Sequence, residues 1–285
     1  MGRPTARNVR TPSGKVAVDT TSGVAPPDAE QELRRATLVA VLPDGIAACL
    51  FDLDGVLTQT AKLHAAAWKE MFDAFLLERS RQTGEPFHPF ETASDYAEYV
   101  DGKLRQDGVR AFLASRGIVL PEGSPDDPPS APTVHGLGTR KNDLVLELIR
   151  GRGVDVYEGS VRFVEAVRDA GLRRAVVSAS KNCGEVLVAA GIEHLFEVRV
   201  DGSVAAEANL RGKPAPDTFL AAAAALGVEP ARGAVFEDAI AGVEAGRAGT
   251  FGWVVGVDRV GQAAALHRHG ADTVVADLSE LLAER

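Results

Sequence analysis

The sequence is poor in cysteine and lacks any long apolar run. Its two cysteines, Cys49 and Cys183, lie far apart without a CxxC partner, which is typical of reduced thiols in a cytoplasmic protein. No apolar stretch approaches the ~20 residues that cross a bilayer. Residues 1–28 lack the apolar centre of a secretory signal, although a mitochondrial-type leader stays open there. We therefore expect a cytoplasmic protein without disulfides or membrane segments.

A surplus of positive charge is missing as well. Lysine and arginine number 31 against 40 aspartates and glutamates, so the net charge is −9 and a nucleic-acid partner is not expected. A local cluster of cations could still bind a small phosphorylated molecule. The length of 285 residues fits one large or two modest domains, and an apolar content of 45% is ordinary for a globular enzyme.

Strand-like and helix-like segments alternate through most of the chain. Short apolar runs predict strands at residues 46–51, 174–178, 196–200, 234–237, 253–257 and 273–275. Helical spacing predicts helices between them, at residues 160–171, 183–191, 214–227 and 239–249. Such repeated units predict an α/β fold, a Rossmann-like parallel sheet with helices on both faces. Its ligand site should lie at the carboxyl ends of the strands.

The segment after the first strand has a different pattern. Apolar residues recur at helical spacing from 63 to about 117, and proline-rich residues 121–132 predict a loop before a further helix at 140–151. We therefore expect a helical cap domain to be inserted after the first strand. The predicted division is a disordered tail at 1–28, a core of 29–62 and 151–285 that opens with a short helix at 29–42, and the cap at 63–150.

Two carboxylates, Asp52 and Asp54, stand at the end of the first strand. Side chains alternate along a strand, so these two leave on the same side, ~6.5 Å apart. Carboxylates at the mouth of an apolar strand repel each other and resist desolvation. The pair therefore indicates a bound cation or a proton held on one member.

Three further polar groups follow later predicted strands. They are Ser178 before a helix start, Lys213 before a proline-started helix, and the adjacent acids Glu237 and Asp238. Each alone has a commoner structural explanation, namely helix capping for Ser178 and Asp238 and simple solvation for Lys213. Together with Asp52 they predict one site at the sheet edge. Carboxylates converging with one lysine suit a Mg²⁺ ion that also binds phosphate oxygens.

These four motifs, in this order, resemble those of the haloacid dehalogenase superfamily of phosphotransferases, over roughly residues 46–280. The resemblance implies that Asp52 is a nucleophile that becomes an aspartyl phosphate, and that Asp54 is the general acid and base. It also implies that Ser178, the Ala179 N–H and Lys213 hold the phosphoryl group. The implied Mg²⁺ ligands are Asp52, the Asp54 carbonyl, Glu237 and Asp238.

Finer matches resemble the β-phosphoglucomutase-like branch of that superfamily. They include Thr58 and Thr60, the run from Arg140 to Asn142, and the run from Ser178 to Asn182. The substrate-binding residues that this resemblance implies are His64, Trp68, Lys103, Arg105 and Asn182, with Arg105 gripping the phosphate that is not transferred. His64 and Trp68 lie at i and i+4 on a predicted helix, so simple packing stays open for both. Gln59 and Ala239 depart from the pattern of the branch.

The resemblance implies a Mg²⁺-dependent enzyme acting on a phosphorylated sugar. The favoured reaction converts β-D-glucose 1-phosphate to glucose 6-phosphate through the 1,6-bisphosphate, with the protein acting as a monomer. A phosphatase using the same aspartyl phosphate stays open, because no core motif decides whether water or a sugar hydroxyl attacks it. A non-catalytic binding protein of the same fold is a third hypothesis.

Overall fold

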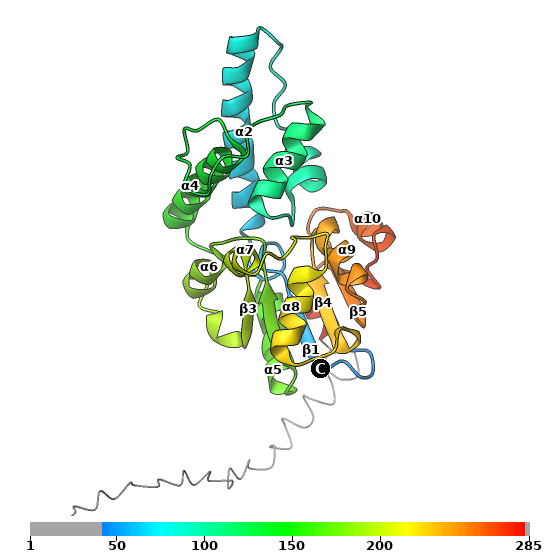
Figure 1. Ribbon diagram of the computed structural model, residues 1–285. Helices are drawn as coiled ribbons and strands as arrows, with labels where there is room; N and C mark the ends of the chain where they lie inside the picture. The colour runs from blue at the N-terminus through cyan, green and yellow to red at the C-terminus, as the bar shows by residue number, and fades with distance from the viewer. Residues whose placement is uncertain (1–41, 283–285) are drawn as a thin grey trace, which may run out of the picture.

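The computed structural model describes residues 42–282, which form a helical body stacked on an α/β body (Figure 1). The predicted tail at 1–28 lies outside the described residues, as does the predicted helix at 29–42 apart from its last residue. No helix among residues 42–282 is both long and apolar enough to span a bilayer.

The α/β body is built on one sheet of six parallel strands in the order β3-β2-β1-β4-β5-β6. The strands are β1 (Ala48–Phe51), β2 (Arg173–Val177), β3 (Val198–Val200), β4 (Gly233–Glu237), β5 (Trp253–Val257) and β6 (Thr273–Val275). Strand β1 lies centrally, with Leu50 in register between Ala175 and Val235. This position places the residues that follow β1 in the middle of the carboxyl edge. The predicted parallel sheet is confirmed.

Helices cover both faces of the sheet because successive strand side chains point to opposite sides. Phe51 joins a fully buried cluster with Phe163 of α5, whereas Leu50 joins Phe219 of α8 in a second cluster on the other face. The helices of this body are α5 (Glu158–Asp169), α6 (Cys183–Ala189), α7 (Gly202–Glu207), α8 (Asp217–Leu226), α9 (Ile240–Ala248) and α10 (Ala263–Arg268). Short 3-10 turns lie at Glu193–Leu195, Pro230–Arg232 and Leu278–Leu281.

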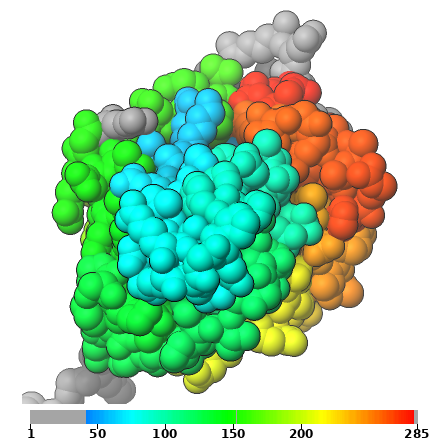
Figure 2. Space-filling model, turned by 90° about the horizontal axis from the view of Figure 1, so that it is seen from above, coloured from blue at the N-terminus to red at the C-terminus, as the bar shows by residue number. Residues whose placement is uncertain are grey.

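The helical body, here called the insertion, leaves the chain after β1 and returns before α5. It comprises α2 (Ala61–Thr83), the π-helical turn η1 (Tyr96–Val100), α3 (Arg105–Ser115) and α4 (Val134–Arg152). It has an aromatic core of its own, in which Phe72 stacks on Trp68 at 5.3 Å and on Phe90 at 5.4 Å between ring centroids. Seen from above, the insertion lies over the α/β body (Figure 2).

The structure differs from the predicted elements in two places. Helix α4 begins at Val134 rather than 140, because Thr133 caps it by accepting a hydrogen bond from the Gly136 N–H. Helices α7 and α10 were not predicted, since six residues are too few for an apolar period to show. The proline-rich loop at 121–132 contains no helix or strand, as expected.

The aromatic cluster beneath β1 should contribute strongly to stability. Phe163 is fully buried, with its ring centroid 5.2 Å from that of Phe236. We expect Phe163→Ala to lower the free energy of unfolding by about 3–5 kcal/mol, because a cavity replaces the ring. The control is Val188→Ala, where the side chain is 60% exposed and the loss should stay below about 0.5 kcal/mol. Urea unfolding measures both, and equal losses would contradict this packing.

Candidate active site

Asp52 and Glu237, at the carboxyl ends of two strands, meet Lys213, from the segment between α7 and α8, in one buried cluster. The Lys213 ammonium lies 2.5 Å from Asp52 Oδ1 and 2.5 Å from Glu237 Oε1, and it donates to the Val177 carbonyl at 3.1 Å. Asp52 follows β1, Glu237 ends β4, and Val177 ends β2, so the parallel sheet itself sets their spacing. The gathering that the motifs predicted is present.

Burial and neighbouring charges shift the pKa values of Asp52, Asp238 and Lys213. Burial raises the pKa of Asp52 well above its usual range, although the Lys213 ammonium opposes that shift. Burial also raises the pKa of Asp238, helped by the carboxylates of Asp101 and Glu237. Burial alone would lower the pKa of Lys213, but Asp52 and Glu237 raise it instead. Lys213 is therefore held as a cation, and its single positive charge is too little to balance the carboxyl groups around it.

Three buried carboxylates of this cluster could hold a divalent cation. One oxygen each from Asp52, Glu237 and Asp238 lies within 4.8 Å of the others. Glu237 is fully buried, its Oε1 lies against the Lys213 ammonium, and its Oε2 accepts a hydrogen bond from the Ala239 N–H at 3.1 Å. Two glycines leave space for these carboxylates. A Cβ on Gly242 would lie 1.8 Å from Glu237 Oε1, and a Cβ on Gly55 would lie 1.8 Å from Asp238 Oδ2. The donor set fits Mg²⁺, which prefers oxygen ligands.

Asp54 lies beside this cluster, at the entrance to α2. Thr60 donates a hydrogen bond to Asp54 Oδ1 and lies 2.6 Å from the hydroxyl of Thr58. His64 Nε2 is 3.6 Å from the same carboxylate oxygen. The first turn of α2 therefore holds the Asp54 side chain away from the three-carboxylate cluster and towards the pocket under the insertion.

The segment after β2 forms another wall of the pocket. Ser178 is buried, and its hydroxyl accepts a hydrogen bond from the Ser180 N–H at 3.1 Å. Ala179, Ser180 and Asn182 line the pocket together with Asp52. The predicted phosphoryl-binding residues thus lie at the same sheet edge as Asp52.

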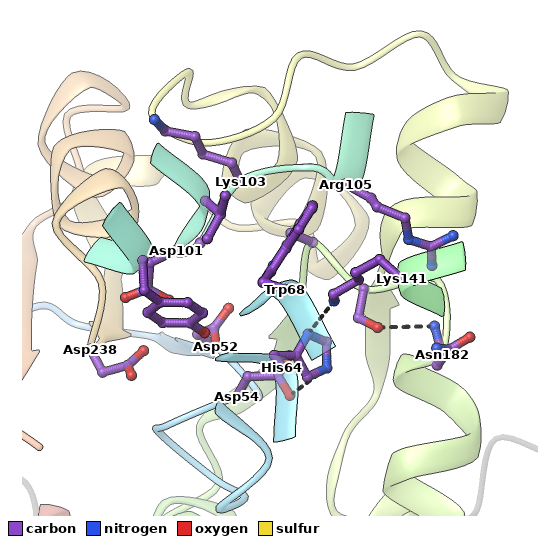
Figure 3. A pocket seen from close by; sticks show the side chains of 15 residues that line it. Asp52, Asp54, His64, Trp68, Asp101, Lys103, Arg105, Lys141, Asn182 and Asp238 are labelled. Atoms are coloured by element: carbon purple, nitrogen blue, oxygen red, sulfur yellow. Dashed lines mark hydrogen bonds and ion pairs between the residues drawn. The ribbon is translucent and has the colours of Figure 1, made fainter. Parts of the chain in front are cut away.

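The insertion supplies cations to the opposite side of the pocket. Arg105 donates to Asn142 Oδ1 at 2.7 Å, and Asn182 donates to the same oxygen at 2.9 Å, which links the insertion to the α/β body. Burial lowers the pKa of Arg105 to about 10. Lys103 also lines the pocket, but its ammonium donates to the Glu98 carbonyl and points away from Asp52 (Figure 3).

Lys141 is a site residue to which the sequence analysis assigned no role. Its ammonium lies 2.9 Å from His64 Nδ1 and 4.9 Å from the centre of the Trp68 ring (Figure 3). Burial lowers the pKa of Lys141 to about 7, with Arg105 adding to the shift. The sequence feature that could have indicated Lys141 was the run from Arg140 to Asn142. Which of these side chains faces the pocket, however, depends on how α4 is rotated about its axis. His64 and Trp68 pack as helix neighbours and also face the pocket.

Asp101 and Tyr96 are two further pocket residues that sequence reasoning missed. Tyr96 is the first residue of the π-helical turn, and Asp101 directly follows that turn. The Tyr96 hydroxyl hydrogen-bonds the Asp101 carboxylate. Burial and the charge of Glu237 together raise the pKa of Asp101 to about 7. Gly102 follows with φ +69°, and a Cβ there would come 3.0 Å from that of Ala239. This close approach seats the turn against the α/β body, and only the sequence pattern Asp-Gly could have indicated it.

An acidic sheet edge with one buried lysine, covered by a cation-bearing insertion, defines an enzyme that transfers phosphoryl groups. The chain belongs to the haloacid dehalogenase-like hydrolase family, whose family model matches residues 46–250. Within that family it falls in the β-phosphoglucomutase-like branch.

Similarity to individual proteins supports this placement. The chain is 59% identical over 244 residues to a β-phosphoglucomutase of Mycobacterium bovis, covering 85% of this chain and 93% of the relative. It is 29% identical over 206 residues to a fructose-1-phosphate phosphatase of Escherichia coli, covering 71% and 92%. The solved β-phosphoglucomutase from Clostridium difficile aligns with a TM-score of 0.65 at 26% identity, covering 83% of this chain and 93% of that structure.

The contact between Lys141 and His64 predicts an unusually acidic histidine. Burial and the charge of the neighbouring Lys141 together lower the pKa of His64 to about 4. We expect NMR titration to show His64 neutral until the pH falls to about 4, with Nδ1 accepting from Lys141. Lys141→Met removes one positive charge and should move this pKa up towards the ordinary value. His64→Gln assigns the resonance, and an unshifted pKa in Lys141→Met would contradict the contact.

Proposed function

We propose that the protein is a Mg²⁺-dependent β-phosphoglucomutase, which converts β-D-glucose 1-phosphate to glucose 6-phosphate through the 1,6-bisphosphate. The observation that carries this proposal is the two-ended pocket, with Asp52 on one side and the cations Arg105 and Lys141 on the other (Figure 3). Removal of one phosphate needs a single phosphoryl site. A sugar carrying two phosphates needs a second, cationic one, and a guanidinium suits that role.

Asp52 is the proposed nucleophile and carries the phosphoryl group between the two sugar positions. The Lys213 ammonium favours the ionised form of Asp52 and lies where charge builds up on the transferring group. Ser178 and the Ala179 N–H complete the proposed phosphoryl site. Such transfer needs positioning and charge neutralisation above all, and these buried groups supply both.

Asp54 is the proposed general acid and base. It gives a proton to the sugar oxygen that leaves and takes one from the hydroxyl that attacks. Thr60 and His64 orient the carboxylate for both steps.

Asp52, Glu237 and Asp238, with the Asp54 carbonyl, are the proposed ligands of Mg²⁺. When bound, the cation neutralises phosphoryl oxygens and the surplus charge of the carboxylates. The chain's own contribution is to keep these oxygens converged, with space for the Glu237 and Asp238 carboxylates left by Gly242 and Gly55.

The insertion is the proposed cap domain, residues 63–150, over a core of 29–62 and 151–285. Arg105 and Asn182 hold the distal phosphate, with Lys103 at the rim, while His64 and Trp68 contact the sugar. Closure of such a cap excludes water and strengthens the charged contacts inside. We propose that the protein acts as a monomer, and its buried free thiols Cys49 and Cys183 suit the cytoplasm.

A sugar-phosphate phosphatase is the second candidate, supported by the similarity to a fructose-1-phosphate phosphatase. The same aspartyl phosphate would then be attacked by water. The core motifs are common to both reactions, so the products must decide between them.

Product analysis tests the proposal directly. We expect the protein, given β-glucose 1-phosphate, Mg²⁺ and catalytic 1,6-bisphosphate, to form glucose 6-phosphate with little inorganic phosphate. Asp52→Asn should abolish turnover while the circular dichroism spectrum stays unchanged, because only the nucleophile is lost. Steady phosphate release without glucose 6-phosphate would establish the phosphatase instead.

The cation site can be tested without an assay of activity. Gly242→Ala should push the Glu237 carboxylate aside, since its Cβ would lie 1.8 Å from Oε1. We expect Mg²⁺ affinity, measured by titration calorimetry, to fall at least about tenfold. Gly151→Ala is the matched control, because nothing lies within 4 Å of a Cβ there. Equal affinities in the two variants would argue against Glu237 as a ligand.

A further inference from the structure

Arg259 lies beyond residues 46–250, which the family model matches, and it contacts the turn that follows β1. Its Nε donates to the Gly55 carbonyl at 2.8 Å and its Nη2 to the Val56 carbonyl at 3.4 Å. These are the two residues directly after Asp54. Arg259 itself follows β5, two strands away from β1 in the sheet.

The other side of the guanidinium is fixed by two separate segments, residues 276–277 and residues 157–160 at the start of α5. Nη1 donates to the Ala276 carbonyl at 2.7 Å and pairs with Asp277 Oδ2 at 3.2 Å, and Nη2 donates to the Ser160 hydroxyl at 3.3 Å. The Tyr157 ring stacks on the guanidinium with its centre 3.5 Å from Cζ. The side chain is 14% exposed, so a rigid planar group is held between the turn and the body of the protein.

A shift of the turn at Gly55 and Val56, which Arg259 holds, would also move Asp54. Gly55 has φ +88° and donates to the Thr58 carbonyl at 2.8 Å, while its Cα faces the Asp238 carboxylate. The Asp54 side chain is fixed on the far side of the same turn by Thr60. Without Arg259, the carbonyls of Gly55 and Val56 would lose a charged donor, and the turn could rotate about the glycine.

We propose that Arg259 is a positioning residue that aims Asp54 at the sugar oxygen by clamping the turn at Gly55 and Val56. The inference rests on the proposed role of Asp54 as general acid. In that step Asp52 Oδ forms a bond to phosphorus as the phosphorus–sugar oxygen bond breaks. The sugar oxygen keeps the electron pair and takes the proton from Asp54.

The need for a general acid depends on the leaving group, and this dependence supplies the test. A sugar alkoxide cannot leave without a proton, whereas p-nitrophenolate is a stable anion and can. We therefore compare single-turnover phosphorylation of Asp52 by glucose 1,6-bisphosphate and by p-nitrophenyl phosphate, in the presence of Mg²⁺. For Arg259→Gln we expect the rate with the bisphosphate to fall about 10–100-fold, within the range of general acid catalysis. The rate with p-nitrophenyl phosphate should change less than about threefold.

Two variants keep this test decisive. Arg259→Lys retains one charged donor and should recover part of the bisphosphate rate, even if Arg259→Gln proves unstable in a melting experiment. Asp54→Asn should show the same dependence on leaving group, more strongly. Equal losses with both substrates in the Arg259 variants, or no loss with either, would overturn the inference. If Asp54→Asn itself shows no such dependence, the proposed acid role of Asp54 fails instead.

Discussion

The site depends on one buried interaction, the Lys213 ammonium held between Asp52 and Glu237. Two carboxylates at the central strands of a parallel sheet would repel each other and lose most of their hydration. Lysine offsets part of this cost for both, and its third contact, to the Val177 carbonyl, fixes its direction. Three strand ends are tied together at one atom. The contacts of Lys213 therefore hold the strand ends together and also position the charged groups of the site.

At the pocket, the α/β body contributes carboxylates, and the insertion contributes cations together with one carboxylate, Asp101. Strand ends of the α/β body supply Asp52, Glu237 and Asp238, whose spacing follows from parallel register and needs no loop to maintain it. The insertion supplies Arg105 and Lys141 from helices that carry their own aromatic core. In the proposed function, such a division leaves phosphoryl transfer to the sheet edge and the contacts to the rest of the substrate to a separate unit.

The sequence predicted those site residues that can be recognised from their immediate neighbours in the chain. Asp52, Ser178 and Glu237 each end an apolar strand, and parallel strands align such ends without further information. Lys141, Asp101 and Arg259 carry no comparable signal. Their positions depend on the register of α4, on a left-handed glycine after a π-helical turn, and on the path of the chain after β5. None of these follows from periodicity, because each is decided by contacts between segments far apart in sequence.

The perturbed pKa values indicate which charges a ligand of this pocket should carry. On the acidic side burial raises the pKa of Asp52 and of Asp238, and on the cationic side it lowers that of Lys141 to about 7 and that of Arg105 to about 10. Burial thus favours the neutral form of these groups on each side of the pocket. A ligand that brings a cation to the first side and an anionic phosphate to the second removes both penalties at once. In the proposed function, a doubly phosphorylated sugar bound with Mg²⁺ gains this binding free energy and a neutral sugar gains much less, so the buried charges are a source of specificity.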